Sequence, residues 1–166
     1  MVLPLNSSTL IVSLVSPFDT YMYINGSPMF VGKSLAGSID LSKAKKLQDA
    51  EFGCRVYPPL ITATLRTITD DHRNLRRIAL DMLDVLIVPY PNYSDPTSFV
   101  RAIGATHGEW LELDRVLARL WRAHSIHVKV LYNAPASMDG KISRGCVESL
   151  LPELMKKGVV DLTRRE

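Results

Sequence analysis

The stretch KLQDAEF at residues 46–52 sets a pattern that the stretch NLRRIAL at residues 74–80 repeats. Apolar residues stand as L-x-x-A-x-F from Leu47 and, 28 residues later, as L-x-x-I-x-L from Leu75. Such spacing is typical of the strand half of a leucine-rich repeat, whose period is about 20–29 residues. The pattern therefore predicts two repeated strands with a connecting helix between them.

Two later segments continue the series. Strand-like sequence at 126–132 and 159–162 gives steps of 50 residues, from Leu80 to Val130, and of 30 residues, from Val130 to Val160. Between the second and third strands, apolar residues recur at helical spacing and predict a helix over 106–123 that packs on the sheet; they are Trp110, Leu113, Leu117 and Leu120. All four predicted strands are expected to lie parallel in one sheet.

The N-terminal part has a different pattern of apolar and turn-forming residues. Leu10, Val12 and Leu14 alternate as in a strand, and Asn25-Gly26 between β-prone runs is a strong hairpin signal. Pro28 suits only an edge strand, because proline lacks the backbone N–H that a central strand needs.

The fold class predicted is α/β: a short, irregular leucine-rich-repeat-like array of parallel strands and helices with an N-terminal β-hairpin. We expect a single domain over residues 1–166, with a β-rich part at 1–42 and an irregular, proline-containing insertion at 83–104. A small closed α/β sheet is the competing architecture, and the 28- and 30-residue steps favour the repeat array.

Composition is that of an ordinary globular domain. The 166 residues are 46% hydrophobic and 22% charged, which excludes a disordered chain and a disulfide-rich toxin. No apolar run approaches the length of a membrane span, and no signal peptide is recognised. Cys54 and Cys146 are too far apart in the chain for a zinc knuckle or a disulfide framework. We therefore expect an intracellular protein, cytoplasmic or nuclear, with no membrane partner.

The net charge of +3 is distributed in small basic groups. These groups are Lys43, Lys45 and Lys46; Arg73, Arg76 and Arg77; Lys156 and Lys157; and Arg164 and Arg165. Each alone is typical of a solvated face or a helix end, so no nucleic-acid partner is expected. Such a partner would require the groups to merge on one face of the protein.

Several stretches together resemble the C-terminal region of fungal F-box/leucine-rich-repeat-like proteins. They are residues 38–42, 46–52, 74–80, 110–125, 150–153 and 157–162, and the resemblance extends over roughly residues 5–165. It implies a non-enzymatic protein-binding role, in which the repeats hold a client protein for a cullin–RING ubiquitin ligase. Residues 3–6 are followed by strand-like sequence rather than by an F-box, so only the repeat portion is carried over.

Two motifs come close to ligand sites. Gly32-Lys33-Ser34 ends like a P-loop, but Ser27 stands where the first glycine of that motif belongs. His124 and His127 form H-x-x-H without the two further ligands that a structural zinc needs. Neither motif predicts a cofactor or a metal.

No catalytic signature emerges, and no residue is assigned a catalytic, cofactor-binding or metal-binding role. Asp70, Asp71 and His72 could seed acid–base chemistry, although a helix-to-strand turn explains them better. The sequence thus predicts a non-enzymatic protein-interaction module with an unidentified protein partner. The competing hypothesis is a small α/β enzyme that uses Asp70, Asp71 and His72, or the Gly32-Lys33-Ser34 loop.

Overall fold

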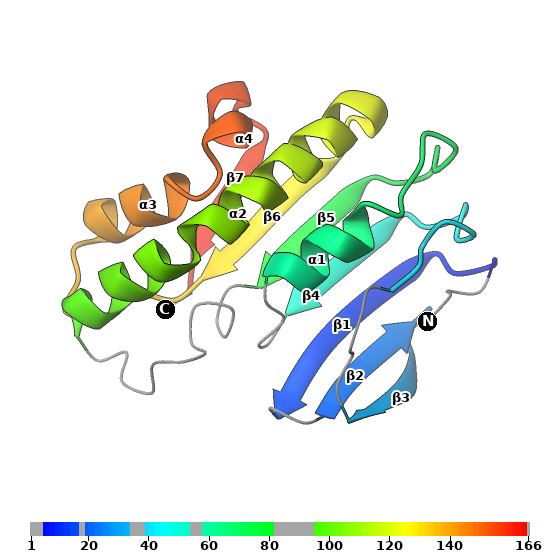
Figure 1. The fold of residues 1–166 in the computed structure, drawn as a ribbon, viewed down its shortest axis with the longest axis horizontal. Helices are drawn as coiled ribbons and strands as arrows, with labels where there is room; N and C mark the ends of the chain where they lie inside the picture. The colour runs from blue at the N-terminus through cyan, green and yellow to red at the C-terminus, as the bar shows by residue number, and fades with distance from the viewer. Residues whose placement is uncertain (1–4, 17–18, 34–38, 54–57, 82–94, 166) are drawn as a thin grey trace.

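The computed structural model describes residues 5–16, 19–33, 39–53, 58–81 and 95–165. Its strands are β1 (Thr9–Ser16), β2 (Asp19–Ile24), β3 (Ser27–Lys33), β4 (Asp49–Gly53), β5 (Arg77–Asp81), β6 (His127–Tyr132) and β7 (Val160–Arg164), and its helices are α1 (Pro58–Leu65), α2 (Pro96–His124), α3 (Gly140–Glu148) and α4 (Pro152–Lys157). The strands form one sheet in the order β3-β2-β1-β4-β5-β6-β7. All four of these helices lie on the same face of that sheet (Figure 1).

Strands β1, β4, β5, β6 and β7 are successive parallel neighbours. This confirms the predicted α/β class with parallel strands in one sheet. The sheet is open, since β3 and β7 are its outer strands, so the closed alternative is wrong for the described residues. Leu80 lies opposite Val130, as the 50-residue step predicts. Val130, however, lies opposite Leu162 rather than Val160, so the last step is two residues longer than predicted.

The N-terminal hairpin is also confirmed. Strands β2 and β3 pair antiparallel around Asn25 and Gly26, which both have positive φ, 52° and 77°. The Asn25 side-chain oxygen also accepts a hydrogen bond from the Ser8 backbone N–H at 2.7 Å. Pro28 lies in β3, an edge strand. Among the described strands, one side of β3 pairs with no other strand, so the N–H that proline lacks is not needed there for a hydrogen bond between strands.

Helix α2 begins at Pro96, ten residues before the predicted start at 106. Residues 96–104, predicted as part of an irregular insertion, are therefore helical, and residues 83–94 of that insertion lie outside the described part. The reason is local: the Asp95 side chain accepts hydrogen bonds from the backbone N–H groups of Thr97 and Ser98. Pro96 has the fixed φ that suits the first helical turn. At 29 residues, α2 is about 43 Å long.

Residues 140–157 form two helices, because Pro152 starts α4 rather than continuing α3. The residue before α4, Leu151, makes no side-chain capping bond. Asp114 of α2, which packs against α4, caps the start of α4 instead. Its carboxylate accepts hydrogen bonds from the N–H groups of Glu153 and Leu154, at 2.7 and 3.2 Å.

The core lies between the helices and one face of the sheet. Alternate strand residues point into it, each at most 1% exposed: Leu10, Val12, Ala50, Phe52, Ile78, Leu80, Val128 and Val130. The predicted helix stripe faces the same core, because Trp110, Leu113, Leu117 and Leu120 are likewise buried. Within the described residues, no helix has the length and apolarity that crossing a membrane would take.

Candidate functional site

His72 is a structural residue in this fold. It is fully buried, with Nε2 2.8 Å from the Leu41 carbonyl oxygen and Nδ1 3.1 Å from the Thr69 backbone nitrogen. In the tautomer that fits both partners, Nδ1 accepts from Thr69 and Nε2–H donates to Leu41. The imidazole therefore joins the turn before β4 to the turn before β5 and has no free nitrogen for proton transfer.

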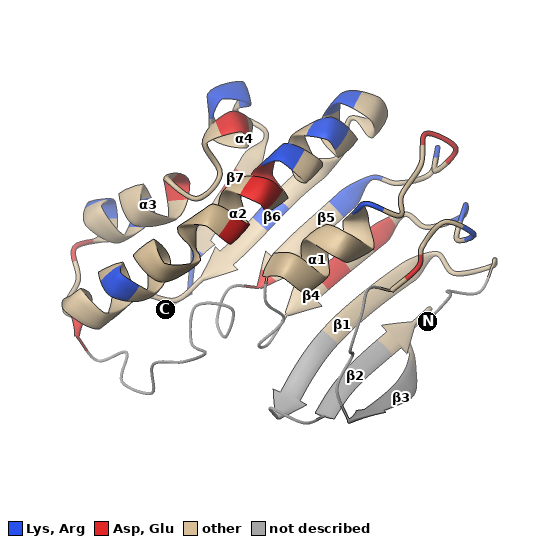
Figure 2. Cartoon of the chain, in the orientation of Figure 1, with Lys and Arg blue, Asp and Glu red and all other residues tan. Residues whose placement is uncertain are grey.

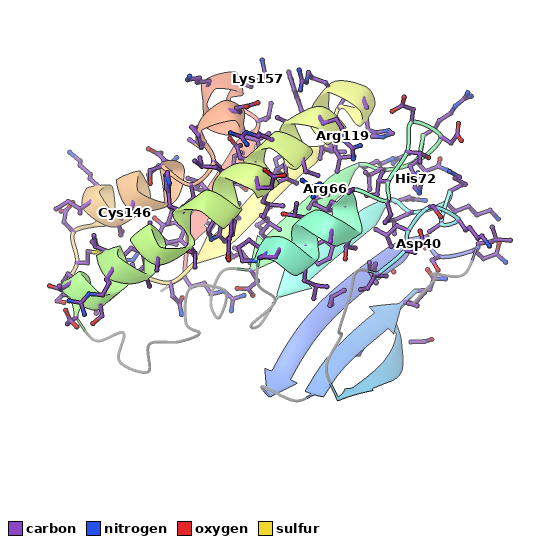
Figure 3. All side chains as sticks on the ribbon, viewed as in Figure 1. Asp40, Arg66, His72, Arg119, Cys146 and Lys157 are labelled. Carbon is purple, nitrogen blue, oxygen red and sulfur yellow. The ribbon has the colours of Figure 1, made fainter. Side chains whose placement is uncertain are left out.

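Asp70 and Asp71 do not converge with His72 on a cavity. Both carboxylates belong to exposed residues, and Asp71 forms an ion pair with Lys45 at 3.6 Å between Nζ and Oδ2. Figure 3 shows His72 among the turns at one end of the sheet, whereas Cys146 lies on α3 at the far side. Burial raises the pKa of the Cys146 thiol, which disfavours the thiolate that a nucleophile needs.

The residues of the two motifs that resemble ligand sites, Gly32-Lys33-Ser34 and H-x-x-H, do not form a site either. Gly32 and Lys33 end β3, an antiparallel edge strand, and Ser34 lies outside the described residues. The described residues between Lys33 and Pro58 contain no helix, so no helix N-terminus follows this loop there to hold a phosphate.

The two histidines of the H-x-x-H motif occupy different elements. His124 ends α2 and His127 begins β6, where its side chain is exposed. Burial, and then the nearby His72, lower the pKa of His124. In the described part of the chain, no three His, Cys, Asp or Glu side chains gather as a metal site.

The two tryptophans differ in setting. Trp110 is fully buried, as expected for core packing. Trp121 is half-buried, and the Lys157 ammonium lies 5.3 Å from its ring centroid. This cation–π contact joins α2 to α4.

The face of the sheet opposite the helices is the best candidate site, because its outward side chains form rows in register. One row crosses four parallel strands through Thr9, Asp49, Arg77 and His127. The next contains Ile11, Glu51, Ala79, Lys129 and Asp161. We call these residues the open face.

The chemistry of the open face is mixed. Arg77 pairs with Asp49 at 3.2 Å between Nε and Oδ1. In the next row Ala79 is buried, and it lies between Glu51 and Lys129, with Asp161 beyond Lys129. Toward the hairpin the surface becomes apolar: Ile11 is 37% exposed and lies opposite Tyr23, which is 36% exposed.

Residues of the open face are present in the repeated pattern, although the sequence does not predict that they form a surface together. They occupy the variable positions between the core residues of L-x-x-A-x-F, such as Asp49 and Glu51 between Leu47, Ala50 and Phe52. Strict alternation along a strand would have assigned them to the second face.

Comparison with known proteins adds no relative: the chain matches no family model, no curated protein and no solved structure.

Proposed function

We propose that the chain is a non-enzymatic protein-interaction module whose open face binds a protein partner. By its resemblance to F-box/leucine-rich-repeat-like proteins, that partner is a client of a cullin–RING ubiquitin ligase. The observation that carries the proposal is that every helix of the described residues lies on one face of the sheet, so none of these helices covers the other face (Figure 1).

The side chains of the open face suit a protein more than a small metabolite. Exposed Ile11 and Tyr23 offer a contiguous apolar contact at one end, and tyrosine is among the residues that dominate binding energy at interfaces. The charges of Glu51, Lys129 and Asp161 alternate across neighbouring strands. A fixed pattern of opposite charges selects a complementary partner and rejects a mismatched one.

The rigidity of the parallel strands also supports binding on this face. The side chains between the sheet and the helices are almost fully buried, so the rows on the opposite face belong to strands whose other side is packed against the core. A preorganised surface loses less conformational entropy on association than a loop does.

The test is affinity capture with two matched charge reversals, followed by identification of the retained proteins. Lys129→Glu alters the open face, whereas Lys141→Glu makes the same change on α3, on the helix side. We expect a partner that the wild type and Lys141→Glu both retain and that Lys129→Glu loses. A partner retained equally by both variants contradicts binding through the open face.

The ligase assignment has its own readout in the same experiment. Cullin–RING subunits or ubiquitylated forms of the partner among the captured proteins support it. If a partner depends on Lys129 but is captured without cullin–RING subunits and is not ubiquitylated, the ligase assignment is wrong. The proposal of an interaction module is then still supported.

A further inference from the structure

Three of the four basic groups of the sequence come together at one edge of the sheet. Lys43, Lys45 and Lys46 lie in the turn before β4, Arg73 and Arg76 in the turn before β5, and Lys156 and Lys157 just before β7. Because β4, β5, β6 and β7 are parallel and consecutive in the sheet, the segments that precede them lie at the same end of it. Figure 2 shows the blue segments gathered at this end of the sheet.

Backbone hydrogen bonds join the turns before β4, β5 and β6. The Arg76 N–H donates to the Gln48 carbonyl at 2.8 Å, and the His127 N–H donates to the Arg76 carbonyl at 2.7 Å. The fourth basic group lies elsewhere: Arg164 is near the end of β7 and donates to the carbonyls of Pro135 and Met138. We call residues 40–49, 69–77, 122–127 and 156–159, which comprise these turns and the adjoining ends of helices and strands, the basic edge.

Charge is strongly unbalanced along the basic edge. Its segments contain nine Lys and Arg residues against four Asp residues, an excess of five positive charges. The whole chain has an excess of only three, so the remainder of the protein is net negative. A predominantly positive surface of this kind raises the local concentration of an oppositely charged partner.

Helix termini explain only part of this charge. Arg122, Lys156 and Lys157 lie in the last turns of α2 and α4, where cations offset the negative end of the helix dipole. Arg73 lies eight residues beyond the end of α1, outside the range of that effect. The lysines at 43–46 follow no helix among the described residues.

Several of these cations have no ionic partner in the described residues. Lys45 pairs with Asp71, and Arg77 pairs with Asp49. Arg73, Arg76 and Lys156 are exposed and form no ion pair within the described ranges. They are free to contact an anionic partner without first breaking an internal bridge.

We infer that the basic edge binds the phosphate backbone of a duplex nucleic acid, independently of sequence. From β4 to β7 the edge crosses three strand spacings, about 14 Å. That length matches about four phosphates of one strand, at about 3.4 Å each. The excess of five positive charges is comparable to the negative charge of those phosphates. The basic edge can therefore replace the counterions condensed on that stretch of backbone.

The residues of the basic edge favour a duplex over a single strand or an acidic peptide. Its four segments contain no Phe, Trp or Tyr, and the adjoining Trp121 is half-buried with the Lys157 ammonium over its ring, so the basic edge offers no open aromatic platform for unstacked bases. An extended peptide gains much of its affinity by adding a strand, but the turns at this edge hydrogen-bond to one another.

The test measures binding of the full chain to a fluorescent duplex of arbitrary sequence, of about 20 base pairs, by anisotropy at about 50 and about 200 mM salt. Arg73→Gln/Arg76→Gln/Lys156→Gln removes three cations of the basic edge. Arg101→Gln/Lys141→Gln/Arg144→Gln removes three from α2 and α3 and leaves the same net charge. The melting temperature of each variant establishes that it is folded.

We expect salt-dependent binding by the wild type, about a tenfold or greater loss in the edge variant and less than a twofold loss in the control. The slope of log affinity against log salt should become less steep by about 2 to 3, because each lost phosphate contact contributes about 0.9. Equal losses in both variants, or no binding at low salt, would overturn the inference. So would tighter binding of poly-glutamate or of anionic lipid vesicles than of the duplex, which would identify a different polyanion.

Discussion

Replacement of Asp114 by Ala should destabilise the protein by releasing α4 from α2. Asp114 is 1% exposed, and its two carboxylate oxygens accept the N–H groups of Glu153 and Leu154. A hydrogen bond to a charged group contributes about 1.5–3 kcal/mol, and burial of the carboxylate offsets part of that. We expect a net loss of about 2–4 kcal/mol in the free energy of unfolding at neutral pH, or roughly 5–15 °C in melting temperature at this chain length.

The pH dependence of the free energy of unfolding tests how the charge of Asp114 affects stability. Burial is the largest influence on this carboxyl group and raises its pKa above 3.8, although its two hydrogen bonds oppose the shift. The folded state therefore binds this proton more tightly than the unfolded state does. The associated stability is present at pH below 3.8 and is lost as the pH rises through the folded pKa.

The pH dependence of stability is measured by urea unfolding of the wild type and of Asp114→Asn. Circular dichroism monitors unfolding from just below pH 3.8 to neutrality. The stability advantage of the wild type over Asp114→Asn should shrink as the pH rises. An advantage that grows with pH, or an Asp114→Ala variant as stable as the wild type, would refute the assigned role of this residue.

Four further substitutions test the core, an exposed ion pair and the turns by thermal unfolding. Leu117→Ala should lose about 2–5 kcal/mol because it opens a cavity in a fully buried site, whereas Arg115→Ala, at an exposed ion pair with Glu112, should change stability by less than about 1 kcal/mol. His72→Ala should lose about 2 kcal/mol or more, since the Leu41 carbonyl and the Thr69 N–H lose their partner; an unchanged melting temperature would contradict a structural role. Gly158→Ala should lose about 1 kcal/mol because φ is 65° there, and a stabilised variant would show that the turn relaxes.

The parallel sheet could be predicted because repeated core positions are a local signal. Leu47, Ala50 and Phe52 recur as Leu75, Ile78 and Leu80, and equivalent burial requires equivalent places in neighbouring strands. The start of α2 was missed although Asp95-Pro96 is a strong helix-start pair. Prolines at 89 and 91 made the preceding segment resemble an irregular insertion that continued past it.

The functional surfaces could not be derived in the same way. Arg73 and Lys156 are 83 residues apart in sequence, and only the sheet topology places their turns at one edge. His72 is polar and lies next to two aspartates, so its complete burial depends on the turn at Leu41, which no local pattern indicates.

The most direct test of the open face is a titration of the purified partner retained in affinity capture against three chains: wild type, Lys129→Glu and Lys141→Glu. Binding through the open face predicts that Lys129→Glu weakens the dissociation constant about tenfold or more, equivalent to about 1.4 kcal/mol. Lys141→Glu should remain within about a factor of two of the wild type. Equal affinity of Lys129→Glu and wild type, or a comparable loss in Lys141→Glu, would contradict the assignment of the open face as the binding surface.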